Sequence, residues 1–274
     1  MTRWSLLAAV SGAVLAAGCS VHVEGTSLIK EPTTGESGTL RFQYGDFGCG
    51  LFFQSCPLDQ PFLVGSEADV EIVDGPSSGH VAFAFEGASA KVTSTMERAS
   101  CDSGSSSRDV DLDAPCGPGE TKKAFRQATL AGVTPGDGKL VVRDARTGAE
   151  IDRVAVHVAN AADLRIEVKR QGPADADSSS VIPDGAVYGV KVSDKVRVRA
   201  DPLDASGKGI RVGRHGIAHE YGDRAVLAPS TDPSLAVFGS SETEDIVAKQ
   251  SGETTLVVRA AGVSRTLRFR VARP

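Results

Sequence analysis

The chain has 274 residues, 41% of them hydrophobic, which is enough for one large domain or two ordinary domains with a real core. The formal net charge is −5, and acidic and basic residues are interspersed along the chain. The sequence has no basic block and no nucleic-acid-binding motif, so it predicts no nucleic-acid partner.

The N-terminal segment is typical of an export signal. Arg3 is followed by an apolar run from Trp4 to Gly18, shorter than the roughly 20 residues that a membrane-spanning helix needs. The residues LAAG directly precede Cys19, and this arrangement resembles the lipobox of bacterial lipoproteins. The resemblance implies a signal peptide over residues 1–18 and a mature chain anchored in a membrane by acylated Cys19. Ser20 stands where an aspartate would signal inner-membrane retention in that family, so the resemblance implies the outer membrane.

Residues 19–38 are polar, rich in Gly, Ser, Thr and Glu, and show no sustained periodicity. We expect them to form a flexible tether between the anchor and the folded part.

From residue 39 onward, apolar and polar residues alternate in many short runs. Such alternation places one set of side chains in a core and the other in water. Clusters of Gly, Pro, Asp and Ser separate the runs, and no helix of ten or more residues is evident outside the signal. The sequence therefore predicts an all-β chain of short antiparallel strands. The apolar faces include Leu40-Phe42-Tyr44, Val70-Ile72, Val81-Phe83-Phe85, Val154-Val156-Val158, Leu164-Ile166-Val168, Val196-Val198-Ala200 and Leu267-Phe269-Val271.

Four cysteines remain besides the predicted anchor: Cys49, Cys56, Cys101 and Cys116. An even number in an exported chain indicates disulfides, and three pairings are possible in principle. Proximity along the chain favours Cys49–Cys56 and Cys101–Cys116. The alternative is a zinc site with four cysteine ligands, although neither pair has the CxxC spacing.

The ring that a Cys49–Cys56 bond would close carries three bulky apolar residues, Leu51, Phe52 and Phe53. If they are exposed, they form a contact patch for a partner. If they are buried, they close one end of the first domain.

The segment 109–120 reads DVDLDAPCGPGE and spaces the carboxylates of Asp109, Asp111, Asp113 and Glu120 like an EF-hand calcium loop. Ala114 stands where that loop needs glycine, and no flanking helices are evident. The segment is therefore a weak calcium candidate, and the alternative is a solvated acidic loop closed by Cys101–Cys116.

An internal repeat divides the chain. Leu140-Val141-Val142-Arg143 and Leu256-Val257-Val258-Arg259 each follow a glycine-bearing turn and precede a similar alternating strand. Their spacing is close to one immunoglobulin-like domain of roughly 100 residues. We therefore expect two tandem immunoglobulin-like β-sandwiches, over residues 39–160 and 163–274.

The stretch 225–272 resembles the second half of a bacterial immunoglobulin-like domain of group-2 type. It runs from AVLAPSTDPSLAVFG through GETTL into a final hairpin. Upstream lies RHGIAHE, residues 214–220, in which His215 and His219 are four apart and Glu220 follows. This is not the HExxH zinc motif, so metal or acid–base chemistry there is a minor alternative to surface histidines.

The sequence contains neither the G-x-S-x-G hydrolase motif nor a phosphate-binding loop. We therefore predict a non-catalytic, lipid-anchored envelope protein, without a cofactor, that serves binding, adhesion or scaffolding. Its expected partners are the membrane and another envelope protein or a polysaccharide. The alternatives are a metal-dependent module or enzyme that uses segment 109–120 or 214–220, and an accessory subunit of an envelope complex.

Overall fold

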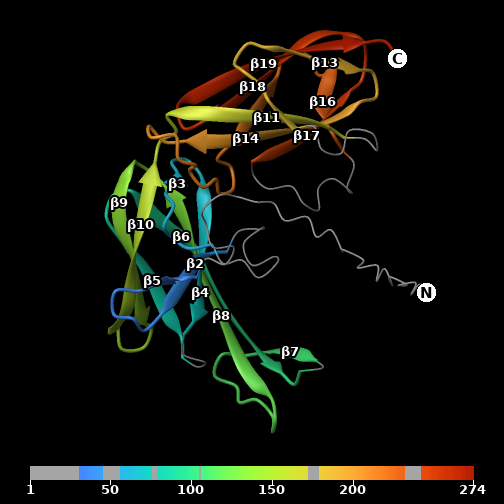
Figure 1. Ribbon diagram of the computed structural model, residues 1–274. Helices are drawn as coiled ribbons and strands as arrows, with labels where there is room; N and C mark the ends of the chain where they lie inside the picture. Colours follow the sequence, from blue (N-terminus) through green and yellow to red (C-terminus); the bar gives the residue numbers. More distant parts are fainter. Residues whose placement is uncertain (1–30, 46–55, 76–78, 105, 172–178, 232–241) are drawn as a thin grey trace, which may run out of the picture.

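The computed structural model describes residues 31–45, 56–75, 79–104, 106–171, 179–231 and 242–274. Every regular element among these residues is a β-strand, and the strands form four sheets that pack as two β-sandwiches (Figure 1). This confirms the predicted all-β fold with two tandem sandwiches. None of the described residues forms a helix long and apolar enough to span a membrane.

The first sandwich packs a six-stranded sheet, in the order β1-β2-β4-β8-β6-β7, against a four-stranded sheet, in the order β3-β10-β9-β5. Its strands are β1 (Thr33–Thr34), β2 (Arg41–Tyr44), β3 (Phe62–Leu63), β4 (Glu67–Asp74), β5 (Val81–Glu86), β6 (Ala90–Asp102), β7 (Ser107–Val110), β8 (Thr121–Gly132), β9 (Gly136–Asp144) and β10 (Glu150–Ala159).

The second sandwich packs a five-stranded sheet, in the order β12-β11-β14-β17-β16, against a four-stranded sheet, in the order β13-β19-β18-β15. Its strands are β11 (Asp163–Gln171), β12 (Ser179–Val181), β13 (Val187–Lys191), β14 (Lys195–Leu203), β15 (Ala218–Tyr221), β16 (Leu227–Pro229), β17 (Thr243–Ala248), β18 (Gly252–Ala260) and β19 (Val263–Ala272).

Each sandwich has its own hydrophobic core, built from the alternating residues seen in the sequence. In β19, Leu267, Phe269 and Val271 are buried, whereas Arg268 and Arg270 point into solvent. In the first sandwich, alternate residues of β2, β4, β9 and β10 meet between the sheets in the same way. The pattern follows because successive side chains of a strand point to opposite faces of its sheet.

The internal repeat occupies equivalent positions in the two sandwiches. Leu140–Arg143 lies in β9 and Leu256–Arg259 in β18, each an inner strand of a four-stranded sheet. Each is followed by its antiparallel partner, β10 or β19, and that partner pairs in parallel with a short edge strand, β3 or β13. The four-stranded sheets of the two sandwiches therefore share one topology.

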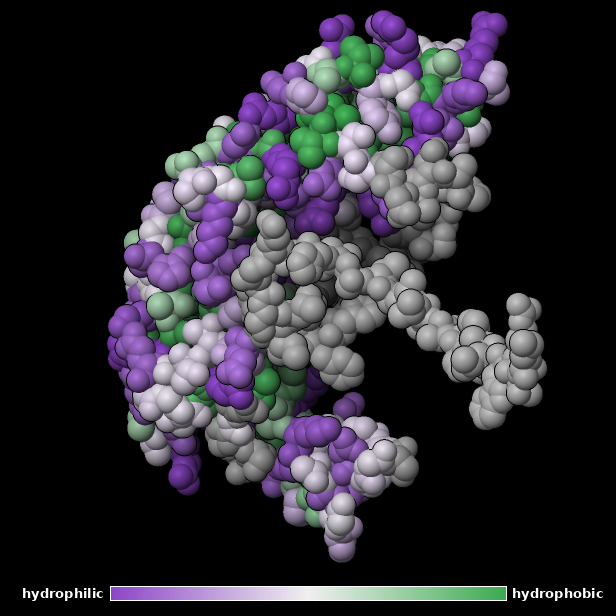
Figure 2. Space-filling model, in the orientation of Figure 1, coloured by the Kyte–Doolittle hydropathy of each residue, from purple (hydrophilic) through white to green (hydrophobic). Residues whose placement is uncertain are grey.

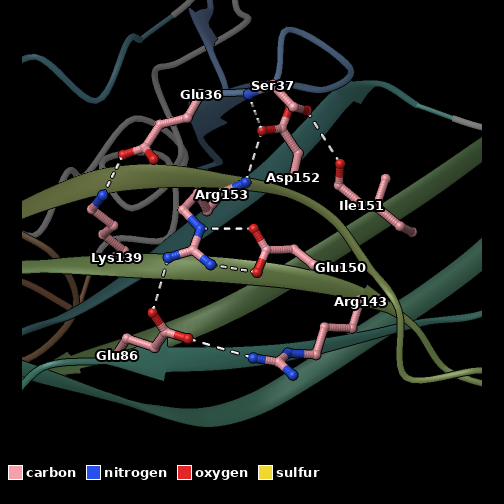
Figure 3. A network of polar contacts seen from close by, with 9 residues as sticks. All are labelled: Glu36, Ser37, Glu86, Lys139, Arg143, Glu150, Ile151, Asp152 and Arg153. Atoms are coloured by element: carbon pink, nitrogen blue, oxygen red, sulfur yellow. Dashed lines mark hydrogen bonds and ion pairs between the residues drawn. The ribbon is translucent and has the colours of Figure 1, made fainter.

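The first sandwich begins earlier than the boundary expected at residue 39. Thr33 and Thr34 form β1, which pairs with β2, so the predicted tether is wrong over this part. The reason is a buried carboxylate on β10, Asp152, which accepts hydrogen bonds from the main-chain N–H groups of Ser37, Thr39 and Leu40 at 2.8–3.0 Å. The bond from Ser37 is drawn in Figure 3. These bonds fix the segment 33–40 on the sandwich.

A surface network of ion pairs extends from the same place. Arg153, next to Asp152, forms ion pairs with Glu150 and Glu86, and Glu86 also reaches Arg143 on β9 (Figure 3). Since these groups are partly exposed, each pair contributes little by itself, and the buried Asp152 is the main attachment point.

Candidate functional site

A three-stranded arm extends from the six-stranded sheet of the first sandwich. Strands β6 and β8, with 13 and 12 residues, continue past the end of β4, and β7 pairs with the outer part of β6 (Figure 1). A disulfide joins Cys101 on β6 to Cys116 in the loop before β8, which confirms this pairing. The bond closes a loop of about fifteen residues, worth roughly 3 kcal/mol in the chain-entropy model.

The acidic segment 109–120 runs from β7 to the start of β8 along one side of the arm, and the side chain of Lys122 lies within it. The Lys122 ammonium donates to the main-chain carbonyls of Leu112 and Ala114, the latter at 2.8 Å. The lysine ammonium thus binds main-chain carbonyl oxygens, and such oxygens are among the ligands of calcium in an EF-hand loop.

The carboxylates of the segment do not converge. Glu120 accepts from Arg108 at 2.8 Å and from the Gly117 N–H, and these bonds hold its pKa below the ordinary value. Asp113 instead lies 3.5 Å from His80. Of the described residues, only Cys101, Cys116 and Glu120 place three metal-type ligand atoms together, and the two sulfurs are already bonded to each other.

His80 connects the arm to the rest of the sandwich. Its Nδ1 lies 3.0 Å from Glu97 on β6, and its Nε2 lies 3.5 Å from Asp113 in the segment between β7 and β8. The hydrogen bond to Glu97 is the largest cause that raises the pKa of His80 above 6.5. Glu97 also accepts the N–H of Val81 and approaches the buried guanidinium of Arg126 at 3.5 Å. The base of the arm is thus held by charged side chains.

A groove of about 580 Å³ lies where the arm meets the sandwich. Its walls come from β2 and β4 on one side and from the three arm strands on the other. Polar and charged side chains dominate the visible surface of the arm (Figure 2). The lining residues with functional side chains are Gln43, Glu71, Arg98, Ser100, Ser107, Asp109, Lys122, Lys123 and Phe125.

The strand register places the main groups of this groove in two rows. Arg98 is opposite Phe125, and its guanidinium carbon lies 4.5 Å from the centre of that ring. In the second row, two residues further along β6, Ser100 lies between Asp109 on β7 and Lys123 on β8. Adjacent strands are about 4.8 Å apart, so each row presents its groups within reach of one small ligand.

The two sandwiches are joined by a polar junction. Arg214, from the loop between β14 and β15, forms two hydrogen bonds of 2.7 and 3.0 Å to the buried carboxylate of Asp69 on β4. Asp69 also accepts from Thr129 on β8. The main chains of Glu67 and Arg214 exchange N–H···O bonds in both directions.

Apolar packing adds to this junction. Leu63 on β3 of the first sandwich belongs to the core cluster of the second, with Val212 and Ile210. The main chains of the two sandwiches approach each other closely at Gly213. A glycine is required there, since a Cβ would lie 1.9 Å from the Glu67 carbonyl oxygen. The junction is therefore continuous with the second core.

The predicted histidine segment 214–220 serves this junction and the neighbouring sheet. His215 has a positive φ of 64° in the turn, whereas the side chain of His219 on β15 is only 10% exposed and lies 3.9 Å from Glu244. Burial lowers the pKa of His219 and outweighs the opposing effect of Glu244. Glu220 forms an exposed ion pair with Arg259. Within the described residues, the two histidines share no metal-type cluster.

Several predicted residues lie outside the described residues: Cys19, Cys49, Leu51, Phe52 and Phe53. Cys56 is described and is disulfide-bonded. Asp109 and Asp111 are described on or next to β7, and both belong to the arm.

Sequence reasoning missed Arg98 and Lys122, and it singled out segment 214–220 for its histidines and not for Arg214. Each is a basic residue in an otherwise ordinary alternating or loop pattern, and its partner is distant in the sequence or is a main-chain carbonyl.

No protein-family model matches the sequence, and the search of curated proteins found no match. Among solved structures, domains 5–6 of the S-layer protein SbsC are 13% identical, covering 85% of this chain and 98% of that chain, with a TM-score of 0.29.

The C-terminal fragment of intimin, solved with the intimin-binding domain of its translocated receptor, is 15% identical, covering 79% and 62% of the two chains, with a TM-score of 0.25. The Escherichia coli adhesin FdeC is 12% identical, covering 89% and 66%, with a TM-score of 0.26. These similarities are too low to carry function to this chain.

Proposed function

We propose that the chain is an exported, lipid-anchored protein of the cell envelope that acts by non-catalytic binding or scaffolding. The observation that carries the proposal is the projecting arm, which a disulfide closes and which presents a polar groove at its base. Binding proteins commonly place recognition groups on extensions and loops that a rigid sandwich positions.

Two further observations support the proposal. The sequence places Cys19 directly after an apolar export-like segment, and acyl chains on that cysteine would anchor the protein. The junction around Arg214 and Asp69 holds the two sandwiches together, so a ligand bound at the arm is carried by one continuous body. The proposed location is the outer membrane, and the proposed partner is an envelope protein or polysaccharide.

The test uses the full chain in bacterial cells. Mass spectrometry of the purified protein should find acyl chains on Cys19 and no residues before it, and Cys19→Ala should move the protein from the membrane to the soluble fraction. Crosslinking in intact cells should then give a specific adduct through the arm. An unacylated Cys19 in a chain that retains residues 1–18 would contradict the anchoring, and the absence of any adduct would contradict the binding role.

A further inference from the structure

We propose that the groove at the base of the arm binds a carboxylated polysaccharide, with Arg98 holding a carboxylate and Asp109 and Ser100 holding ring hydroxyls. This inference rests on the proposed binding function and names the ligand class of that site.

The guanidinium of Arg98 is positioned to bind an anionic group. Its guanidinium stacks on the ring of Phe125, and this contact fixes the plane of the guanidinium while its N–H edge stays free. No hydrogen bond or ion pair engages Arg98 within the described residues, and its side chain is exposed. A guanidinium whose N–H edge is unoccupied can form a bidentate pair of hydrogen bonds with a carboxylate.

Asp109 and Ser100 supply the complementary groups in the next row. They are directly opposite each other on β7 and β6, and neither side chain has a partner among the described residues. A carboxylate accepts hydrogen bonds and a serine hydroxyl both donates and accepts them, so the pair matches sugar hydroxyls.

The same arrangement disfavours an acidic peptide. Asp109 lies on the outer edge strand β7 and Glu71 lies in the opposite wall, so a run of acidic side chains would meet like charges. A polysaccharide with one carboxylate per ring presents mainly neutral hydroxyls to these positions.

The size and openness of the groove fit a segment of a polymer. Its volume of about 580 Å³ lies within the range of roughly 300–1,000 Å³ that is usual for ligand sites. On one side the groove ends at β7, which is the last strand of its sheet. A longer chain can therefore continue past the arm.

The test is calorimetric titration of the full protein with oligogalacturonate, a defined carboxylated oligosaccharide. We expect saturable binding that Arg98→Gln weakens about tenfold or more, because a charge-assisted bond is lost. Asp109→Ala should weaken it by a smaller factor. The matched control is Arg270→Gln, which makes the same charge change at an exposed ion pair of the second sandwich and should leave affinity unchanged. Circular dichroism verifies that each variant is folded.

Two further probes decide the ligand class. Methyl-esterified oligogalacturonate, which lacks the carboxylates, should bind at least tenfold more weakly to the wild type and equally weakly to Arg98→Gln. Hexaglutamate tests an acidic peptide at this site. If hexaglutamate binds as well as oligogalacturonate and loses affinity in Arg98→Gln, the polysaccharide assignment is overturned.

Failure of this inference is distinguishable from failure of the proposed function. No binding of oligogalacturonate, or binding that Arg98→Gln leaves unchanged, overturns the groove assignment, while crosslinking in cells still measures the envelope role. Conversely, a chain without acylated Cys19 that binds oligogalacturonate through Arg98 supports the groove and contradicts the anchoring.

Discussion

At the scale of single residues, Asp152 shows how one carboxylate can organise a chain segment. Both of its oxygens are used: one accepts from Ser37 and Arg153, and the other accepts from Thr39 and Leu40. Burial alone would raise the pKa of Asp152, but these main-chain hydrogen bonds outweigh it and lower the pKa.

We expect Asp152→Asn to destabilise the fold by about 1–3 kcal/mol, since an amide NH₂ would face main-chain donors wherever it points. Chemical denaturation measures the loss. The control is Asp137→Asn, at a side chain that is 82% exposed, which should change stability by less than about 0.5 kcal/mol. Equal effects of the two variants would contradict the role of Asp152.

The pH dependence follows from the sign of the shift. Because the pKa of Asp152 is lower in the folded state, its stabilisation is complete above the ordinary pKa of about 3.9 and is lost as pH falls through the folded value. The difference in melting temperature between wild type and Asp152→Asn should therefore be constant from pH 7 to 5 and shrink below pH 4. A difference that grows in acid would contradict this assignment.

The pKa of His80 is shifted in the opposite direction, so its contact depends on pH in the opposite way. Its pKa is raised by Glu97, so its charged contact with the arm is present below the ordinary value of 6.5 and is lost as pH rises through the higher folded value. An NMR titration should give His80 a pKa above 6.5, and Glu97→Gln should lower that pKa.

At the scale of elements, the arm is a local structure that depends on its own disulfide. Among the described residues, no second sheet packs over the outer part of the β6–β7–β8 ribbon, so the disulfide and the bonds of Lys122 replace a core there. Opening of such a segment costs less than unfolding of the whole domain.

We expect Cys101→Ser with Cys116→Ser to loosen the arm and leave both sandwiches folded. Limited trypsin digestion with mass spectrometry should show faster cleavage at Arg108 and at Lys122–Lys123, while cleavage at Arg143 stays slow. Uniformly faster cleavage along the chain would show instead that the disulfide supports the whole first sandwich.

The sequence allowed most elements to be predicted, because period-two alternation depends only on which face of a strand is buried. The Cys101–Cys116 bond was also predictable, since its cysteines are close in the chain. The groove was not, because Arg98, Asp109 and Glu71 come together through a strand order that alternation does not specify. Spacing alone pointed to a calcium loop, and only the fold reveals that Lys122 binds its carbonyls.

At the scale of the whole molecule, the junction makes two repeats behave as one unit. Arg214 and Asp69 are 145 positions apart in the sequence, and their contact is supported by main-chain bonds and by Leu63 in the second core. Domains in one chain move relative to each other by default, and these contacts oppose such motion here.

We expect Arg214→Ala to separate the unfolding of the two sandwiches, because Asp69 would stay buried with one fewer charged partner. Calorimetry should change from one transition to two, and X-ray scattering should show a larger maximum dimension. Arg259→Ala, which breaks an exposed pair inside the second sandwich, is the control and should do neither. A single unchanged transition in Arg214→Ala would contradict the coupling.

The fastening of residues 33–40 has a mechanical consequence. A pull applied at the N-terminal end of this segment first meets the two-residue pairing of β1 and then the cluster of N–H groups on Asp152. Those bonds link the load to β10, an inner strand of the opposite sheet, and so to the body of the sandwich rather than to its edge. Rupture force in a single-molecule experiment would therefore depend on one side chain, and acid would weaken it.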